Sequence, residues 1–177
     1  VEGPQGAYQL PCDALVLSPG HSARDTFQML HEAGVPMEQK AFAIGVRIEH
    51  PQSAVSLAQF GPAWEKLPAA DYKLSCHLLN GRSAFTFCVC PGGEVVAAAS
   101  EPGLLVTNGM SLRARAGENI NGGFLAGVSP ADFGSDHPLA GMAFQARWEA
   151  AAFALGGGDF RAPAQSVGAF LAGRAGI

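Results

Sequence analysis

The sequence predicts an α+β protein, in which an antiparallel β-sheet domain with flanking helices follows a small α/β segment. Asn80-Gly81 lies between two alternating runs of residues, and this dipeptide is the strongest short-range signal for a β-hairpin. The continuously apolar run at residues 14–17 precedes a glycine turn and a helical pattern, which is typical of α/β structure. Because the composition changes after Pro36, we place the boundary between two domains there.

The first domain, residues 1–36, is predicted to contain a hairpin, a strand and a helix. Glycine and proline turn signals in residues 1–13 indicate the hairpin. The run from Asp13 to Leu17 reads as a buried strand. Ser22 is the expected N-cap of the helix, with Asp25 completing a loose capping box, and Gly34 ends the helix.

The second domain, residues 37–177, opens with a strand over residues 40–50. Successive residues of a strand point to opposite faces, so alternating apolar positions mark the buried face. One face carries the apolar set Phe42, Ile44, Val46, Ile48 and His50. The other face begins with Ala41, Ala43 and Gly45 and continues with Arg47 and Glu49. The small residues predict that backbone or a ligand packs closely against this second face.

Turn signals divide the next part of the domain into further strands. We expect a four-stranded antiparallel meander with strands at residues 72–79, 82–90, 94–100 and 104–108. The polar, glycine-rich residues 117–123 are predicted to form a loop before one more strand at 124–128. Helices are expected at residues 52–60, 138–155 and 166–172, the second with Pro138 at its first position.

Composition excludes several classes of function. A net charge of −4 over 177 residues offers no basic patch, so nucleic acid is not an expected partner. No apolar run approaches the ~20 residues of a membrane span, and no signal peptide is visible, so a cytoplasmic protein is expected. With 15% charged and 48% hydrophobic residues, the chain should leave apolar surface exposed and self-associate through it.

Five sequence blocks, in this order, carry a resemblance to a known family. They are Gly20-His21-Ser22-Ala23-Arg24-Asp25-Thr26, Gly45-Val46-Arg47-Ile48-Glu49-His50-Pro51-Gln52, Phe87-Cys88-Val89-Cys90-Pro91-Gly92-Gly93, Asn108-Gly109-Met110-Ser111 and Gly156-Gly157-Gly158-Asp159-Phe160-Arg161-Ala162-Pro163. The set resembles a family of uncharacterised bacterial FAD-dependent dehydrogenases. The resemblance implies that residues 1–36 are a fragment of the FAD-binding domain and that residues 37–177 form the substrate-side domain, whose last residues lead back to the FAD domain.

The same resemblance implies the cofactor residues. Gly20, His21 and Ser22 stand where a helix N-terminus attracts phosphate or carboxylate, and Gly92 and Gly93 form a second glycine turn. The dinucleotide fingerprint Gly-x-Gly-x-x-Gly is absent from this chain. We therefore expect FAD in a longer parent protein and no tight binding of FAD by this chain alone.

Cys88, Cys90 and Arg47 are the candidate catalytic residues. In a regular strand the Cys-x-Cys pair would place both thiols on one face, where they could serve redox chemistry or simply be two buried small hydrophobes. Arg47 could bind an anionic substrate or pair with Glu49 on the same face.

The other clustered cysteine and histidine, Cys76 and His77, suggest a metal site that the expected register excludes. If Asn80-Gly81 is a two-residue turn, Cys76 lies opposite Phe85 and points away from His77 and from the later cysteines. Four cysteines are too few for a disulfide scaffold of this length. We expect no metal and four reduced thiols.

The function that the resemblance implies is a fragment of an FAD-dependent oxidoreductase that forms the substrate side of the flavin site and is inactive by itself. The alternative is a binding or assembly module without chemistry of its own. A flavin bound by the full-length parent would distinguish the two.

Overall fold

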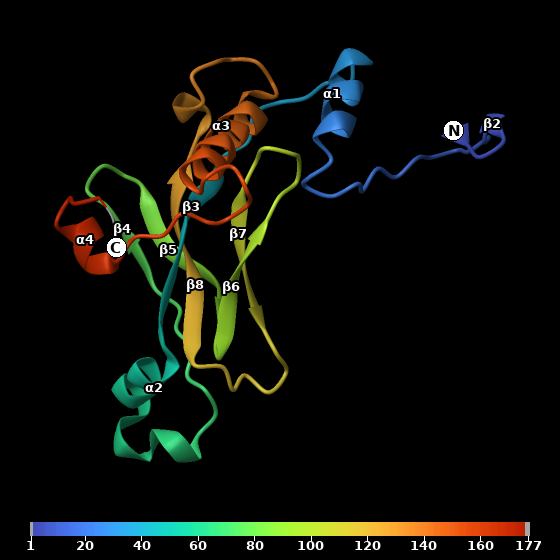
Figure 1. The fold of residues 1–177 in the computed structure, drawn as a ribbon. Coiled ribbons are helices and arrows are strands. Elements are labelled where there is room, and N and C mark those ends of the chain that lie inside the picture. The colour runs from blue at the N-terminus through green and yellow to red at the C-terminus, as the bar shows by residue number, and fades with distance from the viewer. Residues whose placement is uncertain (1, 176–177) are drawn as a thin grey trace. The chain divides into compact units, whose positions relative to one another are not determined.

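The computed structural model describes residues 2–175 and divides into two compact units, residues 1–36 and 37–177 (Figure 1). In the described part of the chain, no helix combines the length and the apolar character needed to cross a bilayer. The assignment of the first unit to a nucleotide-binding domain stays a prediction.

The first unit contains a minimal hairpin and one helix. Strands β1 (Glu2–Gly3) and β2 (Gly6–Ala7) pair antiparallel, and α1 runs over Arg24–Glu32. The expected strand at residues 14–17 is wrong: these residues have no strand partner within the described chain, and Val16 is 85% exposed. A single apolar segment does not form a sheet, because its backbone N–H and C=O groups need a neighbouring strand as hydrogen-bond partner. The N-cap of α1 is Ala23, so Ser22 does not take that position.

The second unit is built on a four-stranded antiparallel sheet in the order β3-β8-β5-β4. The strands are β3 (Phe42–Pro51), β4 (Ser75–His77), β5 (Ser83–Cys90) and β8 (Asn119–Val128). Strands β6 (Gly93–Ala98) and β7 (Val106–Ser111) form a separate two-stranded ribbon. The α+β class is confirmed, but the consecutive meander is wrong, because β5 pairs with β8 and not with β6.

Strand β8 covers residues 119–123, which the sequence predicted as loop. Gly122 and Gly123 allow close packing against β5 and do not form a turn. A methyl group at Gly122 would lie 3.1 Å from the Val89 side chain, and one at Gly123 would lie 3.2 Å from the Phe87 carbonyl oxygen. Ile120, fully buried, stands among these polar and glycine residues and anchors the strand.

Helices flank the sheet at both of its ends (Figure 1). Helix α2 (Gln52–Phe60) continues into the 3-10 helix η1 (Gly61–Lys66). The 3-10 helix η2 (Pro130–Asp132) follows β8, and helices α3 (Ala140–Leu155) and α4 (Val167–Leu171) complete the unit. The expected helices are therefore confirmed, although α3 begins two residues after Pro138.

The apolar core lies where α3 and the segment after η2 pack on one face of the sheet. Phe42 stacks on Phe133 with ring centroids 5.2 Å apart, and Phe133 lies 5.6 Å from Phe144 of α3. Phe42 and Ile44 thus occupy the predicted core face of β3. Val46, on the same face, is 66% exposed, so the expectation that it belongs to the core is wrong for this chain.

The hairpin between β4 and β5 forms, but with a longer loop than expected. The Leu78 N–H donates to the Arg82 carbonyl over 2.8 Å, and Cys76 lies opposite Ala84 instead of Phe85. This shift by one residue moves Cys76 to the face opposite the one predicted. Within residues 2–175, no group of three His, Cys, Asp or Glu side chains could hold a metal ion.

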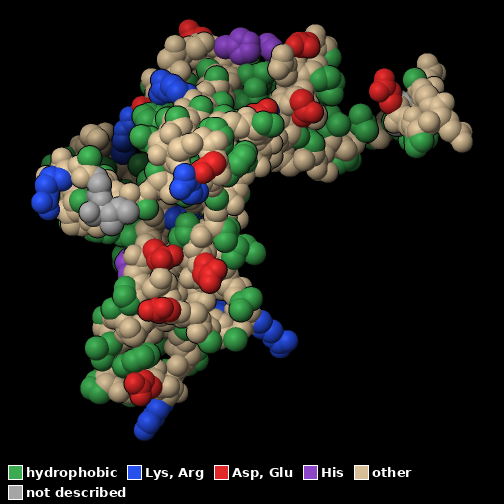
Figure 2. All heavy atoms as spheres, viewed as in Figure 1, with side chains coloured by type: hydrophobic (Ala, Val, Ile, Leu, Met, Phe, Trp, Pro, Cys, Tyr) green, Lys and Arg blue, Asp and Glu red, His purple; other side chains and the backbone are tan. Residues whose placement is uncertain are grey.

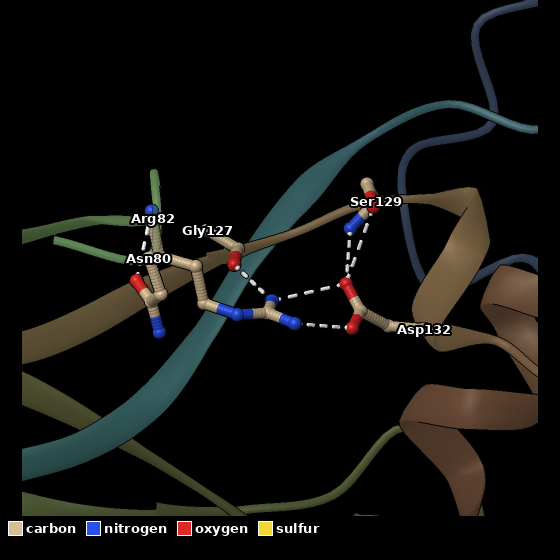
Figure 3. Close-up of polar contacts among 5 residues, drawn as sticks. All are labelled: Asn80, Arg82, Gly127, Ser129 and Asp132. Atoms are coloured by element: carbon tan, nitrogen blue, oxygen red, sulfur yellow. Dashed lines mark hydrogen bonds and ion pairs between the residues drawn. The ribbon is translucent and has the colours of Figure 1, made fainter. Parts of the chain in front are cut away.

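Arg82 joins this hairpin to the end of β8 (Figure 3). Its Nη1 donates to the Gly127 carbonyl and to Asp132 Oδ2, both over 3.0 Å, and its Nη2 pairs with Asp132 Oδ1. Asp132 also accepts the Ser129 N–H in a capping box that begins η2. The Arg82 hydrogen bond, followed by the one from Ser129, holds the pKa of Asp132 well below its usual range.

We expect Asp132→Asn to lower the melting temperature at neutral pH. A carboxylate with a depressed pKa contributes stability above its unfolded pKa of about 3.9, and this contribution is lost as the pH falls. The difference in melting temperature between Asp132→Asn and the unchanged chain should therefore shrink below about pH 4. Asp136→Asn, on the same segment, is the control. A difference that does not change with pH would contradict the ion-pair explanation.

Candidate functional site

Arg47 lies at the centre of the site because of its position in the sheet. It stands opposite Gly123 on β8, and Gly123 stands opposite Phe87 on β5. Since glycine has no side chain, the Arg47 side chain can extend across β8 towards β5. The small-residue face predicted for β3 is explained in part by backbone, because a methyl group at Gly45 would overlap the Phe124 carbonyl of β8.

The guanidinium of Arg47 is held by three contacts. Its Nε donates to Asn121 Oδ1 over 3.0 Å, and its Nη2 donates to the Cys88 carbonyl over 2.6 Å and lies 3.9 Å from Cys90 Sγ. Within the described residues, Nη1 makes no hydrogen bond. Glu49 does not pair with Arg47 but accepts from Asn119, so that alternative from the sequence is wrong. The three predicted catalytic residues are therefore brought together.

Asn121 is a site residue that sequence reasoning missed. It is fully buried, and its Nδ2 has no hydrogen-bond partner in the described chain. The guanidinium of Arg47 can only donate, so the amide oxygen must face it and the unpaired atom must be the nitrogen. The available signal was the alternation of Asn119, Ile120 and Asn121, which the following glycines obscured.

Strand β7 passes over this group. A methyl group at Gly109 would overlap both Asn121 Oδ1 and the guanidinium of Arg47. The motif Asn108-Gly109-Met110-Ser111 therefore has a structural reason: only glycine lets the ribbon approach the arginine. Together β3, β8, β5 and β7 enclose a cationic group with unfilled donors.

His50 of β3 contacts Tyr72, and its Nε2 is 2.8 Å from the Tyr72 hydroxyl. Burial raises the pKa of Tyr72, and the positive charge of Arg47 opposes this shift. The hydroxyl therefore stays protonated at neutral pH. His50 has a partner, as expected of a histidine with apolar parity.

The two cysteines of the Cys-x-Cys pair do not sit in a regular strand. The register shifts by one residue between Phe87 and Cys90, and Cys88 has a left-handed φ of 46°. Cys88 is exposed and Cys90 is partly buried. The premise that the pair lies in a regular strand is therefore wrong, because β5 has a bulge between Phe87 and Cys90.

We expect Cys88→Gly to be neutral or stabilising and Cys88→Val to lower the free energy of unfolding by about 1–2 kcal/mol. Glycine adopts a left-handed φ without strain, whereas a β-branched side chain does not. Urea unfolding of the two variants checks this. At Cys76, which lies in a regular strand, the glycine variant should not be more stable than the valine variant. Equal stability of the two Cys88 variants would contradict the left-handed conformation of Cys88 in the bulge.

Gly92 and Gly93, predicted to bind the cofactor, are buried directly after the bulge. The Gly92 N–H donates to Gln52 Oε1 over 2.9 Å, and its carbonyl accepts from the Gly117 N–H. Gly93 begins β6 and pairs with Ser111. The backbone of Gly92 is thus fully engaged within the chain.

Gly20, His21 and Ser22 lie in the first unit, before α1. Gly20 has a left-handed φ of 87°, as a turn glycine should. The Ser22 carbonyl accepts from the Arg24 N–H over 2.9 Å. The strand expected in front of this turn is absent, so the strand-turn-helix geometry on which the phosphate interpretation depended is not formed here.

A comparison with known protein families decides what the second unit is. The family described as "FAD-dependent protein, C-terminal domain-like" matches residues 41–176. The chain belongs to this family. The match begins at the start of β3, so the FAD-dependent protein C-terminal domain corresponds to the second unit, and the resemblance read from the sequence blocks is confirmed.

A relative of this C-terminal domain is an uncharacterized protein of Clostridium beijerinckii. It is 52% identical over 168 residues, which cover 93% of this chain and 32% of the relative. The chain therefore spans about a third of the length of the curated relative that it matches.

Proposed function

We propose that this chain forms the substrate side of the flavin site in an FAD-dependent oxidoreductase, with Arg47 binding an anionic group of the substrate. The observation that carries this proposal is the Arg47–Asn121 pair, which holds unfilled hydrogen-bond donors in a domain of an FAD-dependent family. Such donors suit a ligand that carries negative charge or acceptor oxygens.

The residues of this chain fit one part of a flavin site and not another. Gly92 cannot cradle the pyrophosphate, because its N–H and carbonyl already have partners within the chain. Arg47, held by Asn121, can bind an acceptor-bearing group close to the sheet. FAD, when bound, would supply the two-electron redox chemistry, and this domain would supply orientation and positive charge.

The surface of the second unit supports a role as one part of a larger protein. Val46 and Phe124 lie opposite each other on β3 and β8 and are 66% and 49% exposed, and Leu74, just before β4, is 63% exposed. Hydrophobic side chains also gather at the end formed by α2 and η1 (Figure 2). Exposed apolar area of this kind is typical of surfaces that another domain or chain covers.

The test uses the full-length protein that contains this chain, with sulfite as the probe. Sulfite bleaches the flavin absorbance more readily when a positive charge lies near the ring. We expect Arg47→Met to keep the flavin and to raise the sulfite dissociation constant about tenfold, which corresponds to ~1.4 kcal/mol. The sulfite dissociation constant of Arg47→Lys should lie between those of Arg47→Met and the unchanged protein. Arg113 is exposed, and Arg113→Met should leave this constant unchanged.

Two outcomes would contradict the proposal in different ways. Full-length protein without bound flavin would favour the binding or assembly module. Flavin with unchanged sulfite binding in Arg47→Met would remove Arg47 from the flavin site. For this chain alone, calorimetry should find no sub-micromolar affinity for FAD, because the glycine fingerprint is absent from its sequence.

A further inference from the structure

The bulge of β5 brings the Cys90 sulfur back towards Cys88. Cys90 Sγ donates to the Cys88 carbonyl over 3.4 Å. In a regular strand, two residues advance ~6.8 Å, which is also about the upper limit of the Cα separation that a disulfide allows. The extra residue between the Phe87–Gly123 and Cys90–Asn121 pairs shortens this span. The bulge thus makes a bond possible that a straight strand would strain.

The chemistry of the two sulfurs differs. Cys88 is exposed and open to a reagent from solvent, whereas Cys90 is partly buried and lies 3.9 Å from Nη2 of Arg47. Thiol–disulfide exchange proceeds by attack of a thiolate on a disulfide sulfur. Nη2 of Arg47 contacts the Cys90 sulfur and the Cys88 carbonyl, and so holds this sulfur beside Cys88. Asn121 and the close approach of Gly109 hold the guanidinium in place.

We propose that Cys88 and Cys90 are a redox-active dithiol, which a small-molecule disulfide of the glutathione type oxidises to an intramolecular disulfide. This site does not depend on the flavin proposal. The Cys88 thiolate attacks one sulfur of the small disulfide, whose S–S bond breaks and releases one thiol. Cys90, as the thiolate, then attacks Cys88 Sγ and releases the second thiol. The protein loses two hydrogens and two electrons, and the small disulfide gains them.

In this sequence Arg47 is a positioning residue for the second step. It touches Cys90 and the carbonyl of Cys88, but it does not contact the reagent that meets Cys88 first. Loss of these contacts should therefore slow the closure of the disulfide and leave the first attack unchanged. Cys12 and Cys76 are exposed free thiols that provide an internal comparison.

The experiment uses the full 177-residue chain carrying Cys12→Ser and Cys76→Ser, which keeps only the pair. After treatment with oxidised glutathione, we expect both thiols to disappear, the mass to fall by two hydrogens and peptide mapping to find Cys88 joined to Cys90. Dithiothreitol should restore both thiols. With Cys90→Ser added, the reaction should stop with one glutathione on Cys88.

Arg47→Met should slow the release of glutathione from Cys88 about tenfold, with Arg47→Lys restoring part of the rate. A purely structural role of Arg47 would not separate the two steps or respond to lysine. The proposal is overturned if glutathione stays on Cys88 while Cys90 is reduced. It is also overturned if the pair reacts no faster than Cys12 and Cys76 in Cys88→Ser/Cys90→Ser. These outcomes are decided without the Arg47 variants, should those fail to fold.

Discussion

Gln52→Leu is expected to lower the free energy of unfolding by about 3–5 kcal/mol, because it would leave several buried polar groups without partners. The Gln52 side chain, 8% exposed, donates to Ser56 Oγ over 3.1 Å and to the Ala70 carbonyl over 2.9 Å. Its Oε1 accepts from the Gly92 N–H over 2.9 Å. Leucine fills a similar volume but supplies neither the donors nor the acceptor.

Gln59→Leu is the matched control, since Gln59 lies on the same helix and its one hydrogen bond, to the Asp71 carbonyl, is exposed. That change should cost no more than about 0.5 kcal/mol. Urea unfolding followed by tryptophan fluorescence compares the two variants. Equal losses would show that the buried network around Gln52 does not stabilise the fold.

Gly92→Ala is expected to be the most disruptive glycine substitution, with a loss of more than about 3 kcal/mol. A methyl group there would overlap the backbone carbonyl of Arg115, and Gly92 also has a left-handed φ of 56°. The atoms that the methyl group would meet belong to the main chain of Arg115 and Ala116, so no side-chain rotation relieves the overlap. Circular dichroism during thermal unfolding measures the loss.

Gly81→Ala separates the two causes. Gly81 has a φ of 81°, but an added methyl group would meet no atom within 4 Å. It should therefore show only the cost of the left-handed backbone, about 1 kcal/mol. If the two variants unfold at the same temperature, the close packing between Gly92 and Arg115 is not the reason for glycine at that position.

Three elements of the second unit were predicted correctly from local signals in the sequence. The alternation in β3, the helix that begins at Gln52 and the stop at Gly156 all depend on neighbouring residues, and each was found. Strand β8 was predicted only over its second half, residues 124–128. Its glycines are required by contacts with Val89 and Phe87, which lie far away in sequence, and composition alone made them look like a loop.

The same distinction between local and long-range signals applies to the candidate site. Arg47, Cys88 and Cys90 were identified from their residue types and their places in strands. Their mutual arrangement was not, because it depends on a bulge that moves one carbonyl towards the guanidinium. Asn121 and Gly109 enter the site through the pairing of β8 and the approach of β7. Neither contact leaves a periodic pattern in the sequence.

The place of β8 in the sheet has a consequence for the order of folding. Phe42 pairs with Val128 and Pro51 pairs with Asn119, so β3 can form its backbone hydrogen bonds only after β8 has been synthesised. Strand β5 pairs with β4 early, but its other edge also remains open until β8 is present. Closing so long a loop is entropically costly and slow compared with forming a hairpin. During synthesis, β3 therefore stays an unpaired strand until most of the chain has been made, and this is when the protein is most exposed to aggregation.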